Sequence, residues 1–185
     1  MPATTATFRF RHGAGRLCLD FTRTLRHRGR ADAVDELTSP AAVAAWVSQF
    51  APAPATAEQA AASSGDAAAR RLREALFALV TAGPADRKLI NEAAAVAPPA
   101  PTLGSDGRLR WHAADPVAAA LSLVARDALD LVTSPLAERV RECADPDCGA
   151  LFLDSSRPGS RRWCAMGSCG NRAKKGTYRD RHAAH

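Results

Sequence analysis

Four of the five cysteines in this chain lie between residues 143 and 169, in two pairs of identical spacing. Four residues separate the members of each pair and fifteen separate the pairs, and the four positions are Cys143, Cys148, Cys164 and Cys169. A segment of about 45 residues is too short to bury a stable core unless a metal, disulfides or a partner supports it. This cysteine cluster therefore constrains the C-terminal fold more than any other feature of the sequence.

Three explanations fit the clustered thiols: one zinc ion, two disulfides, or unpaired structural cysteines. The N-terminus, "MPATTATFRFRHGAGRLCLDF", has no apolar signal-peptide core, which predicts a reducing cytoplasm. Clustered cysteines there bind metal more often than they form disulfides. The loops "ADPD" and "AMGS" can turn each pair of sulfurs towards one point. Four thiolates fill a tetrahedron, so a structural zinc is favoured over a catalytic one, with His182 or His185 as substitute ligands the less favoured alternative.

Short strands are expected beside the cysteines. The segments "ALFLD" and "RRW" can pair around the turn "SSRPGS", with Leu151, Leu153 and Trp163 as the apolar cover. In such a module, the free energy of metal binding is also free energy of folding.

The preceding residues predict a mainly α fold with a few short strands (α+β). Ser39 and Pro40 begin one helix, Asp66 another, Pro84 a third over about 84–97, and Asp115 and Pro116 a long fourth. Strands are expected at "TFRFR" and on both sides of the "SDG" turn. The segment "RLCLDFTRTLRHR" fits either a helix face or a strand face, and a short strand leading into a helix is favoured. We expect a helical domain over 1–138 and a small treble-clef-like zinc module with four cysteine ligands over 139–185.

Several classes of protein are disfavoured. No apolar run reaches the ~20 residues of a membrane span. There is no glycine-rich phosphate loop, no nucleophile elbow and no histidine–carboxylate cluster, so we predict that the protein is not an enzyme. Cys18, between two leucines, is expected to be a buried hydrophobic residue.

The net charge of +6 is concentrated at one end of the chain. Residues 155–185 hold eight Lys and Arg against one acid, or +7, and the other residues hold 17 against 18, or −1. Such asymmetry indicates a polyanionic partner. If the chain continues as a helix after Cys169, a basic face forms, and with the hairpin it gives these candidate nucleic-acid contacts: Arg161, Arg162, Asn171, Arg172, Lys174, Lys175, Arg179 and Arg181.

For two of these candidates, the sequence predicts a more specific role than contact with the phosphate backbone. Asn171 and Arg172 are of the types that read adenine and guanine edges. Arg172 can instead support the zinc site by hydrogen bonding. Tyr178 is the only aromatic residue beyond residue 163, so base stacking as the main binding mode is poorly supported.

The letters "CGNR" at 169–172, with "LFLD" and "SRRWC", resemble the bacterial CGNR zinc finger. Upstream, "LCLDFTRT" resembles the start of the ABATE domain, which usually precedes that finger. Family members commonly have Val-Asn-Thr where this chain has Thr22, Arg23 and Thr24. The resemblance implies a stress-induced bacterial transcription regulator.

The sequence thus predicts a cytoplasmic, zinc-containing, DNA-binding transcription regulator. Its N-terminal domain is expected to bind a small molecule or a protein, or to form a homodimer. The alternatives are a zinc-stabilised protein-interaction module and an RNA-binding protein.

Overall fold

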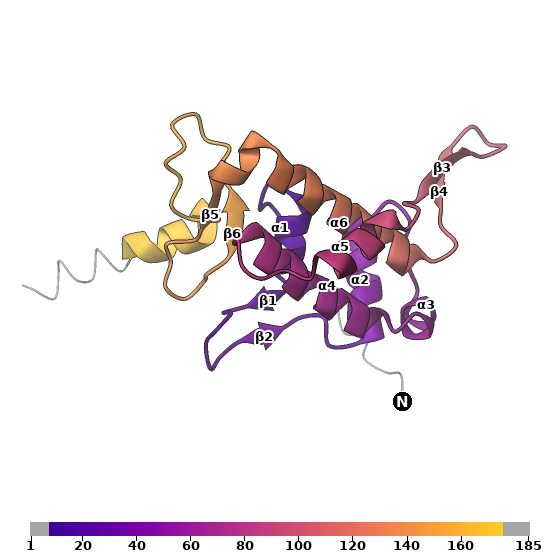
Figure 1. Cartoon of the computed structure of the whole chain (residues 1–185), viewed down its shortest axis with the longest axis horizontal. Coiled ribbons are helices and arrows are strands. Elements are labelled where there is room, and N and C mark those ends of the chain that lie inside the picture. Colours follow the sequence, from indigo (N-terminus) through magenta and orange to yellow (C-terminus); the bar gives the residue numbers. More distant parts are fainter. Residues whose placement is uncertain (1–7, 176–185) are drawn as a thin grey trace, which may run out of the picture.

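The computed structural model describes residues 8–175 of the chain (Figure 1). Within that range, the chain forms helices and three separate two-stranded antiparallel sheets. The elements are α1 (Leu17–Thr22), β1 (Leu25–Arg26), β2 (Val34–Asp35), α2 (Pro40–Phe50), α3 (Ala57–Ala62), α4 (Gly65–Val80), α5 (Arg87–Ala95), β3 (Ala100–Leu103), β4 (Leu109–His112), α6 (Pro116–Thr133), η1 (Pro135–Arg139), β5 (Val140–Glu142), β6 (Leu151–Leu153) and η2 (Met166–Gly170). Here η1 is a 3-10 helix and η2 a π-helix, and residues 171–175 continue η2 as an α-helix. The mainly α class with short strands is confirmed.

Local capping explains where the two most clearly predicted helices begin. The Ala42 amide donates to Ser39 Oγ at 3.2 Å, and Pro40 occupies the first turn of α2. Asp115 accepts from the amides of Val117 and Ala118, both at 3.0 Å, at the start of α6. These side chains satisfy amides that a helix leaves free at its N-terminus, as the sequence predicted.

Two other helix starts were predicted wrongly. Helix α4 begins at Gly65, and Asp66 makes an ion pair with Arg70 at 3.0 Å instead of capping the helix. A Cβ on Gly65 would lie 3.0 Å from the Ala60 carbonyl and 3.1 Å from Val117, so close packing against α3 and α6 sets that start. Helix α5 begins at Arg87, capped by Asp86, rather than at Pro84.

Helix α6 lies at the centre of the helical part and packs against α1, α2, α4 and α5 (Figure 1). Four of its predicted core residues are buried, whereas Val132 is only half-buried. Trp46 is the largest of the fully buried side chains in residues 8–175; its ring meets Phe21 edge to face and stacks on Phe50, with ring centroids 4.8 and 4.9 Å away. The apolar stripes of these helices are thus core.

The N-terminal strands were predicted wrongly. Residues 8–11 form no strand, because the backbone of Phe10 bonds instead to the side-chain amide of Gln49, at 3.1 and 2.9 Å. The segment from Leu17 to Thr22 is wholly helical. The "SDG" hairpin is confirmed: β3 pairs with β4, and it projects from the end of the molecule opposite the last helix (Figure 1).

The predicted hairpin of the C-terminal module has a different partner. Strand β6 pairs with β5, with Val140 opposite Leu153, and residues 161–163 form no strand. Asp154 explains the difference, because it accepts from the Ser156 amide and hydroxyl and from the Arg161 amide at 2.9, 2.6 and 2.9 Å. These bonds close the "SSRPGS" loop on itself and hold the chain away from β6.

The C-terminal module lies directly on α1. The Leu153 amide donates to the Ala14 carbonyl at 2.7 Å. Gly15 has a φ of +90°, and a Cβ there would be 3.1 Å from Leu153 Cβ. The buried cysteines and β6 join one continuous core with the helices. The division into domains at residue 139 stays a prediction. No helix in residues 8–175 is both long and apolar enough to span a membrane.

Candidate metal centre

The four clustered cysteines converge on one point. Their sulfur atoms all lie within 4.8 Å of one another. Cys164 Sγ is 3.6 Å from Cys148 Sγ and 3.7 Å from Cys169 Sγ. Four thiolates around zinc, each at about 2.3 Å, would have sulfurs about 3.8 Å apart, whereas disulfide sulfurs are about 2.05 Å apart. The sulfur positions therefore fit a zinc ion, and all five cysteines of the chain are free of disulfides.

Two tight turns position these sulfurs. Cys143 follows β5 and Cys148 precedes β6, so the first pair closes the β5–β6 hairpin. Asp145 shapes that turn: its carbonyl accepts from the Cys148 amide at 2.9 Å, and its carboxylate accepts from the Asp147 amide at 3.0 Å. Cys169 lies in the first turn of the last helix. A knuckle followed by a helix that carries the fourth cysteine is a treble-clef-like arrangement.

The thiols titrate unequally because they share hydrogen bonds in a buried site. The bond with Cys164 lowers the pKa of Cys148 to about 5. The same bond, followed by burial, raises the pKa of Cys164, and burial raises the pKa of Cys169 to about 12. The protein groups alone therefore favour a mixture of thiolate and thiol. Four thiolates so close together need a cation, which zinc supplies.

Arg23 of the helical part also contacts this cluster. Its side chain is 6% exposed, and its Nη2 lies 3.9 Å from Cys164 Sγ. A buried guanidinium beside the sulfurs stabilises their negative charge. Composition and spacing do not mark Arg23, and the only signal in the sequence was that it replaces the family's usual asparagine.

Arg172 is held by the acidic turn of the first cysteine pair. Its Nη1 lies 3.2 Å from the buried Asp145 carboxylate and 4.0 Å from that of Asp147. Asp147 also pairs with Arg30 of the helical part at 3.0 Å. Arg172 thus ties the last helix to the turn that positions Cys148, through a carboxylate rather than a sulfur, and its supporting role at the zinc site stays a prediction.

The remaining candidates for nucleic-acid binding differ in how far their side chains are already bound by other groups of the protein. Arg161 points into the module: its Nε donates to the Trp163 carbonyl at 2.8 Å, its Nη2 donates to the Cys164 carbonyl, and its guanidinium covers the Phe152 ring. Asn171 is exposed and donates to the Gly167 carbonyl at 3.2 Å.

Three further candidates are exposed cations. Arg162 lies over the Trp163 ring, 5.1 Å from its centroid. Lys174 and Lys175 are exposed at the end of the last helix and have no side-chain partner within residues 8–175. Arg179, Arg181, Tyr178, His182 and His185 lie outside the described residues.

Cys18 lies apart from the metal centre. It is fully buried in α1, and its amide donates to Asp127 at 2.8 Å. Burial, with the nearby Asp127 carboxylate, raises the pKa of this thiol. A neutral buried thiol is unreactive, as expected of a small hydrophobic residue.

Replacing Arg172 by alanine is expected to weaken zinc binding by about tenfold or more, since it frees the turn that orients Cys148. Competition with a chromogenic chelator measures this, and Asp145→Asn should give a similar loss. The double variant should lose little more than either single one. Unchanged zinc affinity combined with lost DNA binding would instead make Arg172 a direct DNA contact.

The fold and the cysteine geometry define a zinc-finger protein with a helical N-terminal part. Comparison with known families agrees. The ABATE family model, described as "Putative stress-induced transcription regulator", matches residues 15–135, and the CGNR zinc finger model matches residues 139–182. The chain belongs to the ABATE family and carries a CGNR zinc finger with one structural zinc site. No curated protein matches the chain.

Proposed function

We propose that this protein regulates transcription by binding duplex DNA through its zinc finger, in which Cys143, Cys148, Cys164 and Cys169 hold one structural zinc ion. The observation that carries the proposal is that the finger exposes the cations Arg162, Lys174 and Lys175, of which the two lysines lie in its last helix. Arg161 and Arg172 are engaged by carbonyls and carboxylates, whereas neither lysine has a partner within the described residues. Free lysines are suited to bind phosphates.

The placement of the finger supports the same function. Figure 1 shows the last helix at one end of the molecule, beyond the helices of the N-terminal part. Its basic residues are therefore accessible to a long polyanion. The family description, a stress-induced regulator, supports a role in transcription. In this proposal, the helical part binds a signal molecule, a protein or a second copy, and the zinc acts structurally.

Arg161 and Arg172 receive revised roles in this proposal. Arg161 holds the finger together from inside and is not a DNA contact. Arg172 positions the last helix, and its half-exposed side chain can still reach DNA. Asn171 remains a candidate reader of adenine, while Arg179 and Arg181 are proposed phosphate contacts from the sequence alone.

The zinc-loaded full chain is expected to bind duplex DNA with a strong salt dependence. If about five cations meet phosphates, a plot of log affinity against log salt should have a slope of roughly −4 to −5. Replacing Lys174 and Lys175 by alanine should flatten the slope by up to about 2 and weaken binding to all sequences alike. Fluorescence anisotropy over a salt series measures both effects.

A matched control removes the same charge elsewhere. Arg71 and Lys88 are exposed on α4 and α5, away from the finger, so replacing both by alanine should leave the slope unchanged. Absence of salt-dependent binding to any duplex would reject the DNA proposal. Binding to structured RNA alone, or to a protein alone, would then favour the corresponding alternative.

A further inference from the structure

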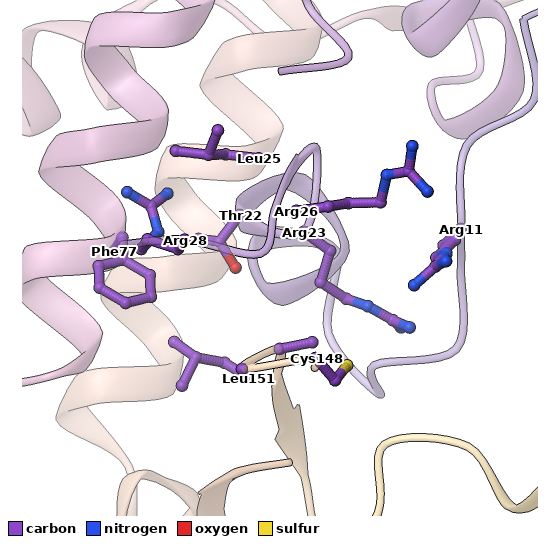
Figure 2. Close-up of a pocket in the computed structure, with 11 residues that line it drawn as sticks. Arg11, Thr22, Arg23, Leu25, Arg26, Arg28, Phe77, Cys148 and Leu151 are labelled. Atoms are coloured by element: carbon purple, nitrogen blue, oxygen red, sulfur yellow. The ribbon is translucent and has the colours of Figure 1, made fainter. Parts of the chain in front are cut away.

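A cleft lies between the helical part and the first cysteine turn, and four arginines line it. We call it the arginine cleft; it is formed by Arg11, Arg23, Arg26 and Arg28, with Leu25, Phe77 and residues 148–151 completing its walls. It has about 360 Å³ of empty space, part of it open to solvent. Figure 2 shows the side chains of Arg11, Arg23 and Arg26 on one side of the cleft and those of Arg28 and Phe77 on the other, with Cys148 and Leu151 below them in this view.

Two buried donors in this cleft have no acceptor. Arg23 Nε has no hydrogen-bond partner, and the other contacts of this guanidinium are long: 3.4 Å to Asp20, 3.4 Å to the His12 carbonyl and 3.9 Å to Cys164 Sγ. Arg26 Nε lies 2.9 Å from Glu36, but its N–H is not aligned on that carboxylate, so it also has no hydrogen bond. Buried donors in proteins nearly always have a partner, and an ion or a water is a common one.

The charges around these donors leave capacity for an anion. Arg28 pairs with Glu74 and lies over the Phe77 ring, so it is already engaged. Arg11 is exposed and makes no hydrogen bond or ion pair within residues 8–175. Burial raises the pKa of Glu36, although Arg26, Arg11 and Arg23 oppose that rise. The positive charges of three guanidinium groups therefore act on this one carboxylate, and only Arg26 forms an ion pair with it.

The size and polarity of the cleft restrict its ligand. The cleft itself has room for about one water molecule, so a bulky apolar compound is excluded and an anion larger than water would be met at its solvent-exposed mouth. Guanidinium groups present forked N–H donors that match the oxygens of phosphate and carboxylate. The thiolates of the four-cysteine cluster, to which Cys148 belongs, would repel an anion placed next to them. We therefore place the anion beside Arg11 and Arg26. A small oxyanion bound there would accept from the donors that have no acceptor.

We propose that the arginine cleft binds a phosphate-class oxyanion, either as the free ion or as a phosphate of the DNA backbone. Binding of free phosphate does not depend on the function proposed above.

Isothermal titration of the zinc-loaded full chain with inorganic phosphate, at constant ionic strength in chloride, tests the site. Wild type should bind, and Arg11→Gln should weaken the affinity about tenfold by removing one charge-assisted hydrogen bond. Arg26→Gln should weaken it as well. The control Arg108→Gln, on the exposed β3–β4 hairpin, should bind as wild type does. Zinc content and circular dichroism establish that each variant is folded.

A second arm distinguishes the two sources of phosphate. If the cleft takes a backbone phosphate, Arg11→Gln should reduce the magnitude of the DNA salt slope by about one. If it takes only the free ion, that slope should not change while phosphate affinity falls. Either result supports the site. Phosphate binding that Arg11→Gln and Arg26→Gln leave unchanged, or no binding of either free phosphate or DNA through these residues, overturns it.

Discussion

Cys164→Ser is expected to reduce bound zinc from one equivalent to almost none and to unfold the finger. Cys164 is buried, and its sulfur lies within 3.7 Å of two other cysteine sulfurs. A serine hydroxyl does not replace a thiolate ligand. Zinc binding contributes about 10–16 kcal/mol in finger peptides, far more than the short β5–β6 hairpin can supply. Zinc release on denaturation and amide exchange over residues 139–175 measure the two losses.

Cys18 provides a matched control for this variant. It is an equally buried cysteine outside the cluster, so Cys18→Ala should keep one zinc and lose only roughly 1 kcal/mol of stability. One equivalent of zinc retained by Cys164→Ser would contradict the proposed ligand set.

The same variant tests the division of the chain at residue 139. We expect α2–α6 to stay protected from exchange in Cys164→Ser, because Trp46 and its neighbours form their core without the finger. Protection in α1 should fall, since α1 loses its contacts with β6 and Arg23 loses the sulfur beside it. Loss of protection in every helix would instead make the chain one cooperative unit.

Asp35→Ala is expected to lower the free energy of unfolding by about 3 kcal/mol or more. The carboxylate of Asp35 accepts two bonds from Arg73, at 2.7 and 2.8 Å, and the Arg73 side chain is only 3% exposed. Without Asp35, this buried guanidinium keeps a single carboxylate, that of Glu74 at 2.9 Å. Urea denaturation measures the loss.

The exposed hairpin offers the matched control for Asp35. Asp106 pairs with Arg110 at 3.0 Å, and both side chains are well exposed. Asp106→Ala should therefore cost at most about 1 kcal/mol. An equal cost for the two variants would show that burial of Arg73 does not matter.

The Asp35–Arg73 pair also predicts how stability depends on pH. Burial tends to raise the pKa of Asp35, but the hydrogen bonds from Arg73 and from the Leu37 amide outweigh it and lower the pKa. Because the unfolded chain then binds the proton more tightly, the contribution of this group is complete above the unfolded pKa of about 4. It is lost as the pH falls from there through the lower native value. Asp35→Ala should therefore show a weaker decrease of stability below pH 4 than wild type.

The parts of the fold that the sequence predicted depend on interactions over a few residues. Ser39 and Asp115 bond to amides two or three positions away, so the starts of α2 and α6 are visible in the sequence. The "SDG" turn likewise joins neighbouring strands. The two matched cysteine pairs predicted the metal centre, because each pair spans one turn and the repeated spacing indicates one shared ion.

The wrong predictions concern segments whose local sequence pattern is compatible with more than one hydrogen-bonding partner. The alternation at "TFRFR" predicted a strand, but Gln49, 39 residues along the chain, satisfies the backbone of Phe10. The segment "ALFLD" paired with β5 rather than with "RRW", because the Asp154 carboxylate closes the intervening loop. Neither outcome follows from hydrophobic periodicity, which indicates a buried face and not which residues cover it.

The sequence by itself determined a helical chain with a four-cysteine zinc finger and a basic C-terminal end, since composition, caps and spacing are local properties. Only the tertiary structure decided which basic side chains are bound by other groups of the protein. Arg161 turns inward, Arg172 is held by Asp145, and Arg23 reaches Cys164 from 141 residues away. The physical reason is that a guanidinium on a long flexible side chain is directed by whichever acceptors packing brings within reach, and those acceptors lie on distant segments.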